Sequence, residues 1–69
     1  MGITARDVQG IISKQLRPGE SMLEQAMWRS LEERIGSTIS LEQARSALGD
    51  AEQFGWIERV GDRIRRPLT

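Results

Sequence analysis

Apolar residues recur at helical spacing in three stretches of this chain. The inner face of the first stretch consists of Val8, Ile11, Ile12 and Leu16. The inner stripe of the second consists of Leu23, Ala26, Met27, Ser30, Leu31 and Ile35. The third arc, at about 100° per residue, consists of Leu41, Ala44, Ala47, Leu48, Ala51 and Phe54. This spacing predicts three amphipathic helices.

Each of the three stretches opens with a helix-capping signal, a pair of polar residues three positions apart. The pairs are Thr4 with Asp7, Ser21 with Glu24, and Ser40 with Gln43. At this spacing the two side chains can bond the backbone N–H groups that lack a partner in a first helical turn. Pro18-Gly19 and Gly36 predict the breaks between the helices. The partly β-branched trio at residues 37–39 can form a very short extra strand before the third helix.

After Gly55 the apolar spacing changes from helical to alternating. Two predicted strands, Trp56 to Val60 and Arg63 to Arg66, are separated by Gly61-Asp62, a dipeptide suited to a two-residue hairpin turn. This turn sets Arg59 opposite Ile64, and Ile57 opposite Arg66. Ile57 and Ile64 then share one face of the hairpin, which we expect to face the helices.

Length and composition limit the chemistry that is available. A chain of 69 residues supports one small core, so we expect residues 1–69 to form a single domain. Histidine and cysteine are both absent, which excludes thiolate nucleophiles, disulfides, zinc sites and a histidine base. We therefore expect no enzyme, no catalytic residue, no metal and no cofactor. The short apolar runs predict neither a signal peptide nor a membrane span, and the default compartment is the cytoplasm.

The net charge is zero, yet the charge is polarised along the chain. Four arginines minus one aspartate give +3 over residues 59–69. Six basic minus nine acidic groups give −3 over residues 1–58. A basic terminal segment on an acidic body indicates a charged partner.

Three consecutive features resemble the winged helix-turn-helix superfamily. They are the capped helix from Ser40 to Ala51, the junction Phe54-Gly55-Trp56-Ile57, and the hairpin that carries the arginines. The resemblance implies an α+β fold: a small winged-helix-like domain with three helices followed by a C-terminal β-hairpin wing. That superfamily usually places its first strand between its first two helices. Here the only β-like trio, at residues 37–39, precedes the third helix.

The resemblance implies a small DNA-binding protein, either a transcriptional regulator or an accessory factor of a phage or mobile element. Its partner would be double-stranded DNA, and the few phosphate contacts of one module favour a homodimer or a larger complex. Phosphates or a minor groove would be held by Arg59, Arg63, Arg65 and Arg66. A major groove would be faced by Gln43, Arg45, Ser46 and Gln53.

The same residues also have simpler interpretations. Arginines on an exposed edge strand prevent pairing with other chains, and small polar residues on a helix are often a solvated face. Glu42 and Asp50 beside Arg45 would repel phosphates, which favours instead a winged-helix protein–protein interaction module that meets an acidic partner surface. Trp56 is expected in the core. Trp28 either covers the edge of the core or anchors a partner.

Overall fold

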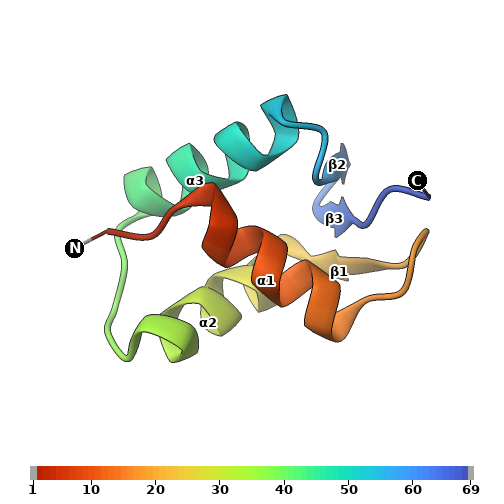
Figure 1. The fold of residues 1–69 in the computed structure, drawn as a ribbon. Helices are drawn as coiled ribbons and strands as arrows, with labels where there is room; N and C mark the ends of the chain where they lie inside the picture. The colour runs from red at the N-terminus through yellow and green to blue at the C-terminus, as the bar shows by residue number, and fades with distance from the viewer. Residues whose placement is uncertain (1, 69) are drawn as a thin grey trace.

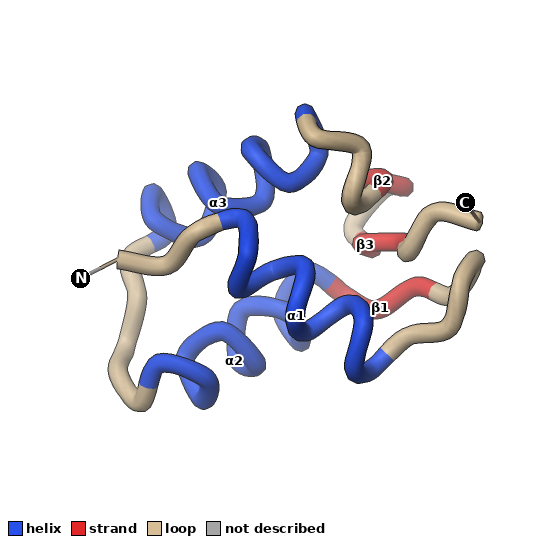
Figure 2. Tube along the Cα trace, in the orientation of Figure 1, coloured by secondary structure: helices blue, strands red, loops and turns tan. Residues whose placement is uncertain are grey.

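The computed structural model describes residues 2–68, which form three helices and one three-stranded antiparallel sheet (Figures 1 and 2). In chain order the elements are α1 (Ala5–Gln15), β1 (Ser21–Leu23), α2 (Glu24–Ile35), α3 (Leu41–Gln53), β2 (Glu58–Val60) and β3 (Arg63–Arg65). The fold is therefore α+β and winged-helix-like, with three helices and a C-terminal hairpin, as the sequence predicts. No helix in this part of the chain is long and apolar enough to cross a membrane.

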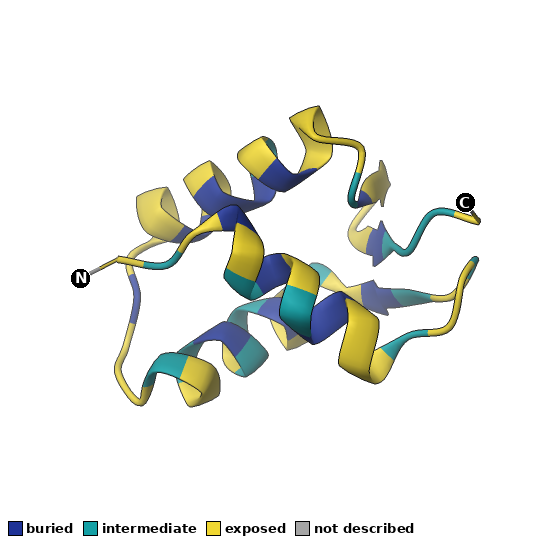
Figure 3. Ribbon diagram, viewed as in Figure 1, coloured by how far each residue is buried: buried dark blue, intermediate teal, exposed yellow. Residues whose placement is uncertain are grey.

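The core lies between the helices and one face of the sheet. α1 packs against both α2 and α3, and the strands gather at one end of the helices (Figure 1). The inward faces of the helices are buried and the outward faces are exposed (Figure 3). No polar or charged residue between 2 and 68 is buried. The most deeply buried side chains are Val8, Ile12, Met27, Leu31, Leu48, Ile57 and Ile64.

The first and third helices begin at their predicted caps. The backbone N–H of Ser40 donates to Gln43 Oε1 at 2.9 Å, and the N–H of Gln43 donates to Ser40 Oγ at 3.1 Å. Thr4 donates its backbone N–H to Asp7 Oδ2 at 2.9 Å. The second helix ends as predicted at Gly36, whose left-handed φ of 70° lets the N–H of the next residue, Ser37, return to the carbonyl of Glu32 at 3.2 Å.

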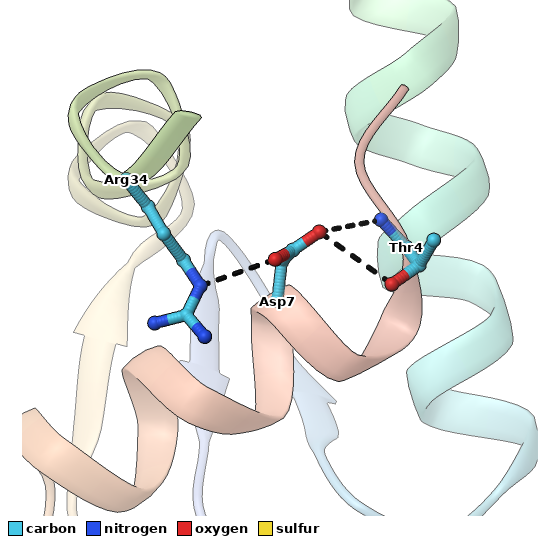
Figure 4. A network of polar contacts seen from close by, with 3 residues as sticks. All are labelled: Thr4, Asp7 and Arg34. Atoms are coloured by element: carbon cyan, nitrogen blue, oxygen red, sulfur yellow. Dashed lines mark hydrogen bonds and ion pairs between the residues drawn. The ribbon is translucent and has the colours of Figure 1, made fainter. Parts of the chain in front are cut away.

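Asp7 also joins the start of α1 to the end of α2. Arg34 donates from Nε to Asp7 Oδ1 at 3.1 Å, while Thr4 occupies the other carboxylate oxygen (Figure 4). The backbone N–H of Thr4 holds the pKa of Asp7 below its ordinary value of 3.8, partial burial opposes this, and Arg34 adds to the lowering. The ionised carboxylate therefore stabilises the folded chain.

The predicted start of the second helix is wrong. Ser21 does not cap it, because residues 21–23 form β1 and the helix begins at Glu24. Met22 is buried opposite Ile64 on β3, and this core contact holds the segment extended. The extra strand predicted at residues 37–39 is also wrong. Residues 37–39 pair with no strand. Ile39 is buried, and its N–H donates to Glu32 Oε2 at 3.0 Å.

The sheet has the order β1-β3-β2. Arg59 pairs with Ile64, as predicted, and Ile57 and Ile64 both reach the core. The strands are shorter than predicted, since the ladder between β2 and β3 stops at the pair of Glu58 and Arg65. The predicted pairing of Ile57 with Arg66 lies outside that ladder.

The ends of two predicted apolar stripes are exposed. The exposed members are Leu23, Ala26, Leu41 and Phe54. Leu23 ends β1 and Ala26 lies in the first turn of α2, because that helix starts two residues later than the predicted cap at Ser21 implies. Leu41 and Phe54 lie at opposite borders of the apolar arc of α3, so they flank its buried centre rather than belong to it.

Candidate interaction surface

The four wing arginines do not share one face of the sheet. Residues that face each other in an antiparallel sheet project to the same side. Arg59 therefore projects to the core side with its partner Ile64, whereas Arg63 and Arg65 project to the outer side. Arg66 reaches back to the residue that follows α1, where its Nη1 donates to the carbonyl of Leu16 at 2.6 Å. The predicted cluster is therefore split between two faces.

Each wing arginine has a partner within the chain. Arg59 lies between two carboxylates, 3.5 Å from Glu24 on α2 and 3.6 Å from Glu52 on α3. The Nε of Arg65 lies 3.0 Å from Glu58 Oε1, at an angle too poor for a hydrogen bond, so this contact is an ion pair. These three carboxylates offset much of the positive charge that the sequence places on the hairpin.

Arg63 is held by β1 rather than by an acid. Its Nε donates to the hydroxyl of Ser21 at 2.8 Å, and its Nη2 donates to the carbonyl of the same residue at 3.3 Å. Its neighbours on the outer side of the sheet are Leu23 and Val60, both exposed. Arg63 therefore clamps β1 to β3 across the sheet.

The four residues predicted on the third helix are exposed, but they point in different directions. Ser46 and Gln53 lie on the outer stripe of α3, while Gln43 and Arg45 lie on its two opposite flanks. The side-chain carbonyl of Gln43 is already bonded to the backbone of Ser40. One arginine among three acids, Glu42, Asp50 and Glu52, leaves the exposed charge of this helix at −2.

A groove of about 350 Å³ lies where β1, α2, α3 and the hairpin turn meet. We call it the α2–α3 groove, and its lining includes Leu23, Glu24, Trp28, Leu41, Arg45 and Asp62. Leu23 is 44 % exposed and Leu41 46 % exposed. The hairpin turn is held at the groove by the N–H of Glu24, which donates to the carbonyl of Asp62 at 3.0 Å.

Some of the charged groups on the rim of the α2–α3 groove form ion pairs within the chain and others do not. Glu24 is engaged by Arg59, whereas neither Arg45 nor Asp62 forms an ion pair within residues 2–68. Trp28 packs against the core, as the first of its two interpretations predicts, and it also lines the groove. The apolar spacing assigned Leu23 and Leu41 to the core, and therefore gave no signal for this groove.

A second exposed apolar feature lies at the far end of α3. Phe54 is 62 % exposed, and its ring lies 4.9 Å from that of Trp56, centroid to centroid. Trp56 packs against the core, as the sequence predicts, but it is only half-buried. Arg6 and Asp50 line the same hollow of about 410 Å³. We call this feature, comprising Phe54, Trp56, Asp50 and Arg6, the aromatic shelf.

Comparison with protein-family models, curated proteins and solved structures found no match for this chain. Its function must therefore be argued from its own surface. Within the described residues, no three potential metal-ligating side chains gather. The groove and the shelf each combine exposed apolar side chains with charged groups that form no ion pair there.

Proposed function

We propose that this winged-helix-like domain is a protein-interaction module, and that its α2–α3 groove receives an apolar side chain from an acidic segment of a partner. One observation carries the proposal. The groove places half-exposed Leu23 and Leu41 and the indole of Trp28 beside Arg45, a cation without an ion-pair partner in the described chain. Fully burying a leucine is worth roughly 1.5–3 kcal/mol, so covering the two half-exposed leucines favours binding.

The chemistry of the partner follows from the groove lining. An apolar side chain would contact Leu23, Leu41 and the indole face of Trp28, a residue type that often anchors interfaces. A neighbouring carboxylate of the partner would pair with Arg45. That pair would be partly desolvated by the surrounding apolar side chains, which strengthens it relative to a fully exposed pair.

The arrangement of the arginines argues for protein rather than DNA as the partner. Arg59 and Arg65 are matched by carboxylates, Arg63 and Arg66 hold segments of the fold, and α3 exposes a net charge of −2. A DNA-binding surface gains affinity by releasing counterions from phosphates. Here the cations are already neutralised or engaged, so that gain would be small.

Peptide selection from a random display library tests the protein-binding proposal. We expect the selected peptides to share an apolar residue beside an aspartate or glutamate, and to bind the wild-type domain. Leu41→Lys and Arg45→Glu should each weaken binding of these peptides at least tenfold, because one removes the apolar contact and the other reverses the charge. Gln53→Lys, on the outer stripe of α3, is the matched control. Peptides that bind all four proteins equally would contradict the proposal.

DNA binding is the second candidate, and the position of β1 favours it. β1 lies between α1 and α2, which is where the winged helix-turn-helix superfamily usually places its first strand. On this ground we infer that the chain belongs to that superfamily. The pairing of Arg65 with Glu58 is half-exposed, so it is worth at most about 1 kcal/mol and could exchange for a phosphate. In this alternative the domain would act as a transcriptional regulator or as an accessory factor of a mobile element.

Salt titration decides whether DNA is bound through the outer face of the hairpin. If it is, the change of Arg63 and Arg65 to glutamine should reduce the slope of log affinity against log salt concentration by up to about 2. Glu33→Gln, on the exposed face of α2, serves as the control for nonspecific charge effects. Absence of binding to random duplex DNA at low salt would remove this candidate.

A further inference from the structure

Phe54 and Asp50 form an apolar and acidic pair on one flank of α3. The two residues are four positions apart, which places their side chains side by side on a helix surface. Phe54 is 62 % exposed, and Asp50 is exposed without an ion pair among the described residues. An exposed phenyl ring beside a free carboxylate is the chemistry that the α2–α3 groove is suited to receive.

The charges of the aromatic shelf complement those of the α2–α3 groove. The groove carries Arg45 and Asp62, and the shelf carries Asp50 and Arg6. None of the four forms an ion pair within residues 2–68. In a shelf placed on a groove, Asp50 could therefore pair with Arg45 and Arg6 with Asp62, while the phenyl ring contacts the leucines.

The size of the groove is compatible with this occupant. An apolar cavity of about 150 Å³ accommodates a benzene molecule in a protein interior. The α2–α3 groove, at about 350 Å³, therefore has room for the ring of Phe54 and part of its surroundings. The half-exposed side chains of Leu23 and Leu41 would provide the apolar contacts of that ring.

We propose that the chain associates with itself head to tail, with the aromatic shelf of one copy seated in the α2–α3 groove of the next. This proposal rests on the proposed function, since it names the partner of the same groove. Arg45 and Asp50 are five residues apart on α3, and therefore about 140° apart around its axis. The two surfaces are thus separate, and a copy that fills its neighbour's groove still offers its own.

The symmetry of such an assembly follows from the two different surfaces. A contact between unlike surfaces is heterologous, and it repeats until the rotation between copies closes a ring or continues as a filament. Every interface would use one shelf and one groove. Two-fold symmetry would require each copy to seat its shelf in the other copy's groove at the same time, because an isologous interface pairs residue i with j and j with i.

Sedimentation velocity over a concentration series up to about 1 mM tests the proposal, since that range detects even millimolar association. We expect the average mass of the wild-type domain to rise with concentration. Arg45→Asp and Asp50→Arg should each abolish the rise, because each places like charges at the interface. The variant that combines both changes should restore it. Glu42→Arg, a charge reversal on the outer stripe of the same helix, is the matched control and should leave the rise unchanged.

Mixing two defective variants gives a second readout that is specific for unlike surfaces. Phe54→Ala lacks a working shelf and Leu41→Lys lacks a working groove, so each should stay monomeric alone. Their mixture should form 1:1 dimers and nothing larger, since only one productive contact remains. Circular dichroism establishes that each variant is folded, as expected for exposed positions.

The outcomes separate failure of this inference from failure of the proposed function. A wild-type domain that remains monomeric up to about 1 mM, while acidic apolar peptides still bind its groove, would overturn self-association and leave the protein-binding function standing. A wild-type domain that neither associates with itself nor binds such peptides would overturn both the inference and the proposed function. Association that persists in Arg45→Asp would show that the chain assembles through another surface, and would also overturn the inference.

Discussion

The body of three helices and the hairpin end of this domain are held together by different interactions. Between the helices the buried contacts are apolar, since no polar residue of the described chain is buried, and the polar links from α1 to α2, such as Arg34 with Asp7, lie at the surface. At the hairpin end, arginine side chains reach to the residue that follows α1 and to α2, α3 and β1. Strands of three residues bury little surface, and a sheet this small is marginal without support. The comparison indicates that the arginines, which look like ligands for a partner in the sequence, stabilise the sheet.

The largest effect should come from the helical body. Leu48 is 2 % exposed near the centre of the buried face of α3. Leu48→Ala should lower the free energy of unfolding by about 2–4 kcal/mol, because the lost side chain leaves a cavity. Thermal unfolding followed by circular dichroism measures the change, and Leu41→Ala, at a half-exposed position of the same helix, is the control. Equal effects of the two changes would contradict the assigned core.

The hairpin end should respond most strongly at Arg66. Its guanidinium bonds the carbonyl of Leu16 just after α1, where a cation also interacts favourably with the helix dipole. Arg66→Gln should lower the free energy of unfolding by about 1–2 kcal/mol. Arg59→Gln, which removes only exposed ion pairs, should cost no more than about 1 kcal/mol. Urea unfolding of both variants compares them, and a larger loss at Arg59 would reverse our ranking of the clamps.

Asp7 should make the stability of the helical body depend on pH. Its pKa is lowered in the folded chain, so its contribution is present above the ordinary value of 3.8 and is lost as the pH falls through the folded pKa. Asp7→Asn should therefore cost roughly 1 kcal/mol near neutral pH, as loss of a capping residue does, and the difference from wild type should shrink below about pH 4. Unfolding curves at several pH values test this. A difference that is constant with pH would exclude the mechanism.

The smallest expected effect concerns the two glycines that lie inside helices. A Cβ at Gly49 would have no atom within 4 Å, whereas one at Gly10 would lie 2.9 Å from the guanidinium of Arg34. Gly49→Ala should raise the free energy of unfolding by about 0.5–1 kcal/mol, because alanine loses less backbone freedom. Gly10→Ala should gain less, since Arg34 must move away from Asp7. Melting temperatures compare the pair, and a larger gain at Gly10 would contradict this reasoning.

The parts of the fold that depend on neighbouring residues could be predicted from the sequence. The caps at Thr4 and Ser40, the end of α2 at Gly36 and the pairing of Arg59 with Ile64 are all confirmed. Each of these features is determined within a few positions by side-chain spacing or by turn geometry.

The start of α2 could not be predicted, because it depends on a remote partner. Ser21 and Glu24 have the spacing of a capping pair, yet Ser21 lies beside Arg63, which is 42 residues away in the chain. The burial of Met22 against Ile64 then outweighs the local capping preference. No property of residues 21–24 alone indicates that contact.

The candidate site shows the same division between local and remote information. The position of Arg45 on an exposed flank of the third helix follows from helical spacing. The groove beside it does not, because its walls come from β1, α2, α3 and the hairpin turn. The same applies to Arg59, since its partners Glu24 and Glu52 lie on two separate helices. Charge counts along the sequence therefore overestimate how much of this basic segment is available to a partner.

The central position of β3 also determines the order in which the sheet can form during folding. β2 joins β3 across the two residues Gly61 and Asp62, whereas β1 reaches β3 only by closing a loop of about 40 residues, at a greater entropic cost. The hairpin can therefore form early, and β1 pairs with β3 once packing of the helices has brought the two ends of that loop together. We expect Met22→Ala to accelerate unfolding while leaving the folding rate nearly unchanged, because contacts absent from the transition state affect mainly the unfolding rate.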